Sequence, residues 1–162
     1  MKYRGSRDGF LAKDFHERCD GISPTVVLYL TKKGISIAGF TSLKWNSDND
    51  DLLFDNDETA MIFNLTAKLV FPVKDHEFAM CNSKHIGPSF GNFDILVYSP
   101  FNNKGYCKAS VQRRSFMIAT EQDEVNPLTG DRIIFIKECD ILGHFSNSTL
   151  NDIEVWQIIY CD

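Results

Sequence analysis

Residues with the chemical potential for catalysis lie near the start of the chain, where Ser6, Arg7, Asp8 and Gly9 precede Phe10. A serine acts as a nucleophile only beside a general base, and this stretch contains no histidine to activate it. Asp8 stands just ahead of a predicted helix, where a carboxylate accepts hydrogen bonds from free backbone N–H groups. We therefore interpret the stretch as a structural turn, with Asp8 capping the helix and Phe10 anchoring the turn in the core.

A second candidate is an acidic segment between residues 48 and 58, which contains Asp48, Asp50, Asp51, Asp55, Asp57 and Glu58. An EF-hand needs ligands at alternate positions, then a glycine and a closing glutamate. Leu52 and Leu53 occupy the places of the third ligand and the glycine. The segment is therefore predicted to be a solvated loop or an acidic surface for a basic protein partner, with calcium or carbohydrate binding as the weaker alternative. Residues Glu121, Asp123 and Glu124 form a second candidate of this kind.

The cysteines and histidines do not form a metal-binding pattern. The cysteines are Cys19, Cys81, Cys107, Cys139 and Cys161, and the histidines are His16, His76, His85 and His144. The odd number and wide spacing of the cysteines oppose a disulfide framework and a zinc site, so we expect neither a metal nor a cofactor. A reactive thiol remains an alternative at Cys19, next to Arg18, and at Cys107, next to Lys108 in a predicted loop.

Several common active-site signatures are absent from the sequence. It contains no GxSxG, no GxGxxG and no P-loop, and "GPSFGN" at residues 87–92 has no lysine to bind phosphate. We interpret that stretch as a loop whose glycines turn the backbone. The sequence therefore favours a protein without catalytic activity.

Bulk composition narrows the class of protein. A length of 162 residues predicts one domain spanning residues 1–162, and 43% hydrophobic residues can form a sizeable core. The net charge of -5 comes from interspersed charges, which opposes nucleic-acid binding. No apolar run approaches the length of a membrane span, and residues 1–5 lack a signal peptide's apolar stretch. We expect a cytoplasmic protein that is not inserted in a membrane.

The pattern along the chain is mostly β. Apolar positions predict a helix at residues 12–19, and Gly34 supplies the turn of a hairpin. The predicted strands cover residues 24–30, 35–41, 59–65, 68–73, 77–82, 93–99, 115–120, 132–142 and 153–160. Because residues 153–160 are apolar at both alternating sets of positions, this strand is predicted to be covered on both faces. The predicted class is mostly β with flanking helices (α+β), a β-sandwich with a short N-terminal helix.

Five stretches, taken in order, resemble the TLDc domain family, and most of all its short divergent members in protists. They are residues 3–21, with the opening turn Arg7, Asp8, Gly9 and Phe10; residues 23–45, ending in Gly39, Phe40, Ser42 and Trp45; residues 59–65; residues 87–99, with Gly87 and Gly91; and residues 150–158, with Glu154 and Trp156. The resemblance runs from about residue 3 to residue 160. It fits poorly at residues 101–147, and Leu11 stands where the family often has a capping serine, which places that role on Asp8.

This resemblance implies a sandwich of two antiparallel sheets flanked by short helices, without catalytic residues. It implies a part in protection against oxidative stress and, as for several family members, binding to the peripheral cytosolic part of the V-type proton ATPase. We therefore expect a protein-interaction module that docks on a larger cytosolic assembly. Two alternatives are a structural component of a cytoskeletal or axonemal complex and a cysteine-based redox protein. Trp45 is expected in the core.

Overall fold

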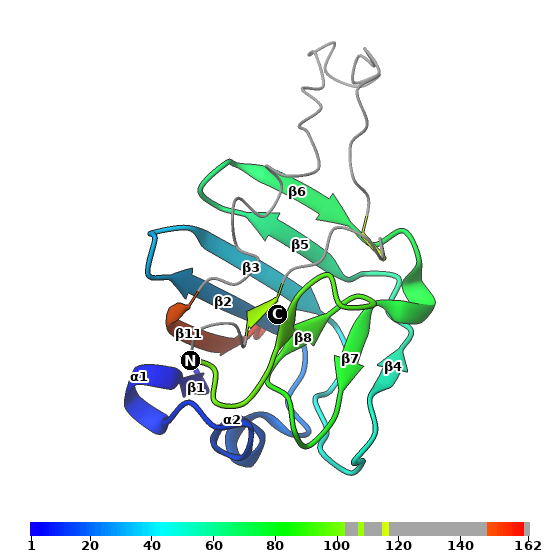
Figure 1. Cartoon of the computed structure of the whole chain (residues 1–162). Helices are drawn as coiled ribbons and strands as arrows, with labels where there is room; N and C mark the ends of the chain where they lie inside the picture. Colours follow the sequence, from blue (N-terminus) through cyan, green and yellow to red (C-terminus); the bar gives the residue numbers. More distant parts are fainter. Residues whose placement is uncertain (103–106, 109–114, 117–148, 161–162) are drawn as a thin grey trace.

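A computed structural model describes residues 1–102, 107–108, 115–116 and 149–160 of the chain. Within these residues the fold is mostly β, with a six-stranded and a three-stranded antiparallel sheet and two short helices near the N-terminus (Figure 1). The predicted fold class, mostly β with two antiparallel sheets and flanking helices, is confirmed.

The six-stranded sheet joins both ends of the sequence. Its strands, in spatial order, are β1 (Tyr3–Arg4), β11 (Leu150–Gln157), β2 (Thr25–Thr31), β3 (Ser36–Thr41), β5 (Met61–Asn64) and β6 (Leu69–Pro72). The predicted hairpin is confirmed: β2 pairs with β3, with Leu28 opposite Ala38, and Gly34 adopts a φ of 79° in the turn. Strand β11 lies between β1 and β2, so a strand near residue 155 completes a sheet that starts at residue 3.

The other strands differ in part from the sequence pattern. The three-stranded sheet contains β4 (Leu53–Asp55), β7 (Met80–Asn82) and β8 (Ser89–Phe90), while β9 (Leu96–Val97) pairs with β10 (Cys107–Lys108). Strand β4 lies inside the predicted acidic loop, and β8 lies inside the predicted glycine-rich loop. Cys107 is in a strand, not in the predicted loop. These corrections share one cause, because the strands are fixed by pairing with distant segments and not by a local pattern.

The core lies between the two larger sheets. Along β2, Val27 and Tyr29 are buried, while Val26, Leu28 and Leu30 on the alternate positions are less so. The Tyr29 hydroxyl donates to the carbonyl of Pro88 at 2.8 Å. The core also includes, as predicted, the Trp45 side chain, which is 1% exposed.

The prediction for the last strand is wrong for one of its faces. Ile153 and Val155 are buried, but Trp156 is 42% exposed, and Ile159 and Tyr160 lie beyond the end of β11 and are more exposed still. The buried residues face the sandwich core, and Trp156 projects from the opposite side of the sheet. One side of the six-stranded sheet therefore carries exposed apolar side chains.

The helices lie beside β1 at one end of the sheet (Figure 1). Helix α1 (Gly5–Asp8) was not predicted, whereas α2 (Ala12–Cys19) occupies the predicted positions. Ala12, Phe15 and Cys19 are buried on one face, as their spacing indicated, and His16 is buried with them. A 3-10 helix, η1 (His76–Phe78), takes the place of the start of the strand predicted at 77–82. The strand predicted at 132–142, and residues 117–120 of the one before it, lie outside the described residues.

Candidate functional site

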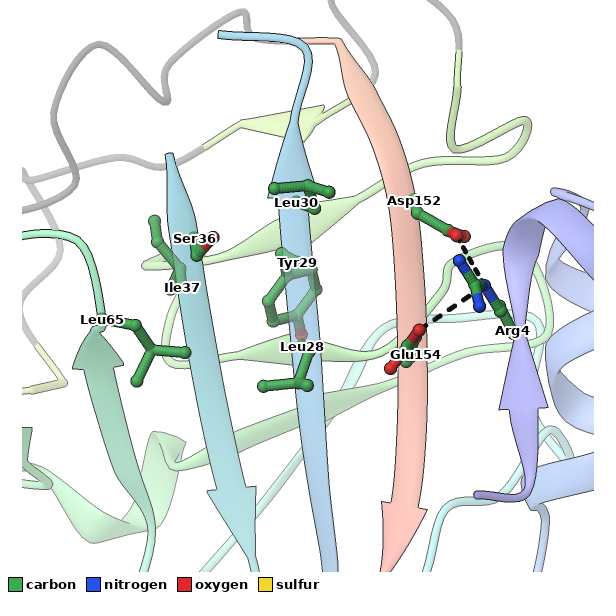
Figure 2. A pocket seen from close by; sticks show the side chains of 9 residues that line it. All are labelled: Arg4, Leu28, Tyr29, Leu30, Ser36, Ile37, Leu65, Asp152 and Glu154. Atoms are coloured by element: carbon green, nitrogen blue, oxygen red, sulfur yellow. Dashed lines mark hydrogen bonds and ion pairs between the residues drawn. The ribbon is translucent and has the colours of Figure 1, made fainter. Parts of the chain in front are cut away.

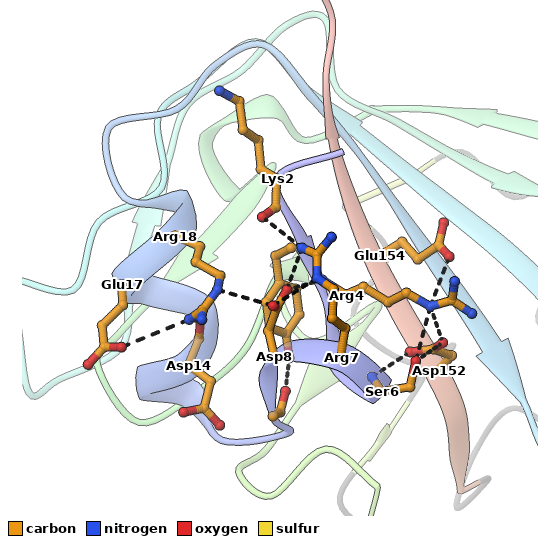
Figure 3. A network of polar contacts seen from close by, with 12 residues as sticks. Lys2, Arg4, Ser6, Arg7, Asp8, Asp14, Glu17, Arg18, Asp152 and Glu154 are labelled. Carbon is orange, nitrogen blue, oxygen red and sulfur yellow. Dashed lines mark hydrogen bonds and ion pairs between the residues drawn. The ribbon is translucent and has the colours of Figure 1, made fainter.

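Ser6 belongs to a polar network that joins the first helix to the last strand (Figure 3). Its hydroxyl donates to Asp152 Oδ2 at 2.7 Å, and its backbone N–H donates to Asp152 Oδ1 at 3.0 Å. Arg4 Nε donates to the same carboxylate at 2.8 Å. Burial raises the pKa of Asp152, but the hydrogen bonds from Ser6 and Arg4 outweigh it and the net pKa is lowered. Ser6 thus has a structural role in this network, in agreement with the interpretation of residues 6–10 as a structural turn.

The role predicted for Asp8 as the cap of the helix at residues 12–19 is wrong. Asp8 is the last residue of α1, where its carboxylate accepts hydrogen bonds from the Arg4 N–H at 2.9 Å and from Arg7 Nη2 at 2.7 Å. The hydrogen bond from Arg7 holds the pKa of Asp8 down at about 2. The N–H of Leu11, the residue that precedes α2, donates instead to Asp14 Oδ2 at 3.0 Å. Because residues 5–8 form a separate helical turn that the sequence pattern did not show, Asp8 does not cap the start of α2, and its Oδ1 lies instead 3.4 Å from Nε of Arg18 in the last turn of α2.

Phe10 follows this turn as a partly buried side chain that packs against the core, in agreement with its predicted anchoring role. Gly9 precedes it with a φ of 109°, in the region that favours glycine. A Cβ at Gly9 would overlap the carboxylate of Asp14. The opening motif therefore forms a turn that requires glycine at position 9 and is anchored in the core by Phe10.

Three aspartates of the acidic segment are exposed, as predicted: Asp48, Asp50 and Asp51. Asp50 Oδ1 lies 2.5 Å from Lys84 Nζ and 3.1 Å from His85 Nε2. Hydrogen bonds from these two side chains lower the pKa of Asp50. Asp50 is thus paired within the domain, while Asp48 and Asp51 remain available to a partner. Glu58, at the end of the segment, is also exposed.

Asp57 is buried, and its predicted role in binding a partner is wrong. Its side chain is 3% exposed and lies between the end of β3 and the start of β5. It accepts hydrogen bonds from the Thr41 hydroxyl (2.7 Å), the Ser42 N–H (2.8 Å) and hydroxyl (2.9 Å), and the Thr59 N–H (2.9 Å) and hydroxyl (2.6 Å). Burial raises the pKa of Asp57, but these donors outweigh it, and the net pKa is lowered. Ser42 of the family motif thus has a structural role.

The remaining acidic candidates divide between the described and undescribed parts of the chain. Asp55 is half-buried in β4 and accepts a hydrogen bond from Asn82 Nδ2 at 2.8 Å, so it is not the exposed loop residue that was predicted. Glu121, Asp123 and Glu124 lie outside the described residues.

Two motif glycines admit aromatic rings into the core. A Cβ at Gly39 would overlap the ring of Phe90, and a Cβ at Gly87 would overlap the ring of Phe101. Trp45 meets Phe90 edge-on, with ring centroids 5.7 Å apart. The motif residues Gly39 and Trp45, which lie on either side of Ser42 in the sequence, therefore contact the same aromatic ring.

A groove that the sequence pattern did not predict lies on the exposed side of the six-stranded sheet (Figure 2). Leu28, Leu30 and Leu65 line it, and its volume is about 210 Å³. The charged residues Arg4 and Glu154 lie along one edge, where their side chains approach to 3.5 Å. The only sequence signal for this groove was that the strand at residues 24–30 is apolar at successive positions.

The apolar surface extends beyond the groove across the sheet. Strand pairing places Leu28, Ala38, Phe63 and Val70 in one row, and Trp156, Val26, Phe40, Met61 and Pro72 in the next. We call these two rows, with Leu30 and Leu65, the outer face. Its most exposed side chains are Leu30 (37%), Met61 (36%), Leu65 (47%), Val70 (56%) and Trp156 (42%). Glu154 Oε2 accepts a hydrogen bond from Trp156 Nε1 at 2.9 Å, which holds the two motif residues together at one end of the face.

Residues 1–159 match the TLDc domain family. The chain belongs to this family. No curated protein matches the chain. TLDc domains are associated in general with oxidation resistance and with the V-type ATPase, and they are generally non-catalytic.

The cysteines of this TLDc domain do not supply a reactive thiol where the structure describes their side chains. Cys19 and Cys81 are both buried, and burial raises the pKa of each thiol to about 12. Since the thiolate is the reactive form, the prediction of a reactive thiol at Cys19 is wrong. Cys107 remains a candidate in β10, and Cys139 and Cys161 lie outside the described residues.

Within the described residues, no group of three or more His, Cys, Asp or Glu side chains is arranged to hold a metal ion. The helices described there are too short to cross a membrane, the longest being the eight residues of α2.

Proposed function

We propose that this TLDc domain is a non-catalytic protein-interaction module, and that its outer face docks on a larger cytosolic assembly. The observation that carries the proposal is the row of exposed apolar side chains on the six-stranded sheet, of which Val70 is 56% exposed. Extended apolar patches on a folded protein typically mark interaction surfaces. The association of TLDc domains with the V-type ATPase makes the peripheral cytosolic part of that pump the first partner to test.

The outer face has the composition of a protein interface. Its centre is apolar, at Leu28 and Leu30, and one edge is charged, at Arg4 and Glu154. An apolar core with a polar rim is the usual anatomy of an interface between proteins. The exposed aspartates of the acidic segment and the net charge of -5 would favour approach to a basic partner surface.

The test is a pull-down of the tagged domain from native extract, with partners identified by mass spectrometry. Leu30→Ser removes an apolar side chain from the outer face, where Leu30 is 37% exposed. Leu53→Ser is the matched control, because Leu53 is 43% exposed but lies in β4 of the other sheet. Because both leucines remain more than half buried, each substitution is expected to cost about 1–2 kcal/mol of stability, and the cost should be similar in the two variants.

The proposal expects V-type ATPase subunits with the unaltered domain and the Leu53→Ser variant, and a loss of them with Leu30→Ser. Recovery of cytoskeletal or axonemal proteins, lost with the same variant, would keep the interaction module but assign it to a structural complex. Equal recovery with both variants would remove the outer face as the docking surface. If recovery of the partner instead depends on Asp48 and Asp51, the docking surface is the acidic segment and not the outer face.

A further inference from the structure

His16 is a buried, polar side chain that the proposed interaction surface does not use. It lies in α2 and is 6% exposed. Its Nδ1 lies 2.7 Å from Asp20 Oδ1, and its Nε2 lies 3.1 Å from the carbonyl oxygen of Ser83 and 3.0 Å from that of Ile86. The ring therefore bridges α2 and residues 83–86, the segment that connects β7 with β8.

All three partners of the His16 ring are hydrogen-bond acceptors. Backbone carbonyls never donate, and a carboxylate donates only when it carries a proton. The Asp20 carboxylate already acts as an acceptor, because the Ser47 hydroxyl donates a hydrogen bond to its other oxygen, Oδ2, at 2.5 Å. A neutral imidazole has a single N–H, so one ring nitrogen would direct its lone pair at an acceptor. Both contacts of His16 are satisfied together only when both nitrogens carry protons.

The charged surroundings of His16 are mixed in sign. Lys13 and Glu17 of α2, Asp20 directly after α2, and Lys84 of residues 83–86 surround it. These residues, with Ser47, line a pocket of about 240 Å³ that reaches the ring. Asp50 is next to Lys84, and its Oδ1 accepts hydrogen bonds from the side chains of Lys84 and His85. Solvent in this pocket gives the ring a route for proton exchange that does not require the core to open.

We propose that His16 is held as the imidazolium and makes the contact between α2 and residues 83–86 sensitive to pH. Loss of the second proton as pH rises leaves a lone pair facing either Asp20 or the two carbonyl oxygens, so the contact weakens. The amides of Lys84 and Ile86 report on it, because they donate to the carbonyls of Asn49 (3.0 Å) and Ser83 (3.2 Å) within the segment that would loosen.

The first test is nitrogen-15 NMR of the histidine rings in the unaltered domain. At pH 6.5 both ring nitrogens of His16 are expected at the shifts of protonated nitrogen. A shift typical of an unprotonated nitrogen on either atom of His16 at this pH would overturn the proposal. This measurement needs no variant and so does not depend on one folding.

The second test is hydrogen exchange of the Lys84 and Ile86 amides, expressed as protection factors at pH 6 and pH 8.5. Protection is expected to fall by about tenfold at the higher pH, the effect of losing one hydrogen bond to a charged group. His16→Gln, which is neutral at both values, should show low protection and no such fall. His85→Gln is the control and should behave like the unaltered domain. Equal pH dependence in His16→Gln and the unaltered domain would contradict the proposal.

Discussion

The ring of Phe90 in β8 lies directly against the backbone of Gly39 in β3, in the space that a Cβ at Gly39 would occupy. This contact brings the two larger sheets together beside Trp45, whose ring also meets Phe90. The φ of Gly39 is not in the positive region that favours glycine. Glycine is therefore needed here for the close approach of the two sheets and not for its backbone conformation.

Gly39→Ala is expected to lower the free energy of unfolding by about 1–3 kcal/mol, because it overfills a packed core. Urea unfolding followed by tryptophan fluorescence measures this loss. Phe90→Leu in the same chain should recover part of it, since the smaller side chain leaves room for the methyl group. Additive effects of the two substitutions would show that the residues are not energetically coupled.

Asp57→Asn is expected to destabilise the domain by about 2–3 kcal/mol at pH 7, since an amide cannot replace a carboxylate as acceptor for all its donors. The folded pKa of Asp57 lies below its ordinary value of 3.8. Its contribution is therefore present above pH 3.8 and is lost as pH falls through the folded pKa. Urea unfolding should show a difference between the variant and the unaltered domain that shrinks below pH 3.8. Asp51→Asn, at an exposed position, is the control, and an equal effect there would contradict the prediction.

The contribution of Asp94 to stability is expected to change with pH in the direction opposite to that of Asp57. Burial raises its pKa from 3.8 to about 6, although it accepts the Ser115 N–H at 3.1 Å. The neutral form favours folding, so this contribution is complete below pH 3.8 and is lost as pH rises through 6, at a cost of about 2–3 kcal/mol. Asp94→Asn keeps an acceptor for Ser115 without the charge. It should be more stable than the unaltered domain at pH 7.5 and equal to it at pH 3.8 in urea unfolding; lower stability at pH 7.5 would contradict this.

Asp14, and not Asp8, is expected to control the start of α2. Asp14→Ala should cost about 0.5–2 kcal/mol, as for other lost helix caps, and should speed hydrogen exchange at the Leu11 amide that it bonds. Asp8→Ala should leave exchange at Leu11 unchanged, because its hydrogen bonds go to Arg4 and Arg7. Glu17→Ala, at an exposed position of the same helix, controls for the loss of a carboxylate. Faster exchange at Leu11 in Asp8→Ala would restore the original capping role.

Cys19 and Cys81 are expected to resist thiol reagents in the folded domain. With pKa values raised to about 12, each has roughly a thousandfold less thiolate than an ordinary cysteine at neutral pH. Maleimide labelling at pH 7.5, followed by peptide mapping, should find both unmodified before unfolding and modified after it in urea. Rapid labelling of Cys19 in the native domain would return the cysteine-based redox hypothesis to consideration.

Much of the fold could be predicted from local patterns in the sequence. The helix at residues 12–19 and the hairpin around Gly34 depend on contacts between near neighbours, so spacing and turn chemistry are sufficient to find them. Strands β4 and β8 could not be found in this way. Each has only two or three residues and is stabilised by pairing with β7, from a different part of the chain.

The charge or hydrophobicity of a residue was not sufficient to predict whether its side chain is exposed. Asp51 and Asp57 look alike in an acidic stretch, yet only Asp57 meets Thr41, Ser42 and Thr59, because the ends of β3 and β5 converge on it. Likewise Val155 and Trp156 are adjacent apolar residues, and only the sheet's second layer buries the first and leaves the second exposed. The sequence by itself determined the family motifs, the secondary structure with a local signal and the lack of a recognised catalytic signature. The tertiary structure decided which carboxylates are buried and which side of the sheet is open to a partner, because both depend on segments that only folding brings together.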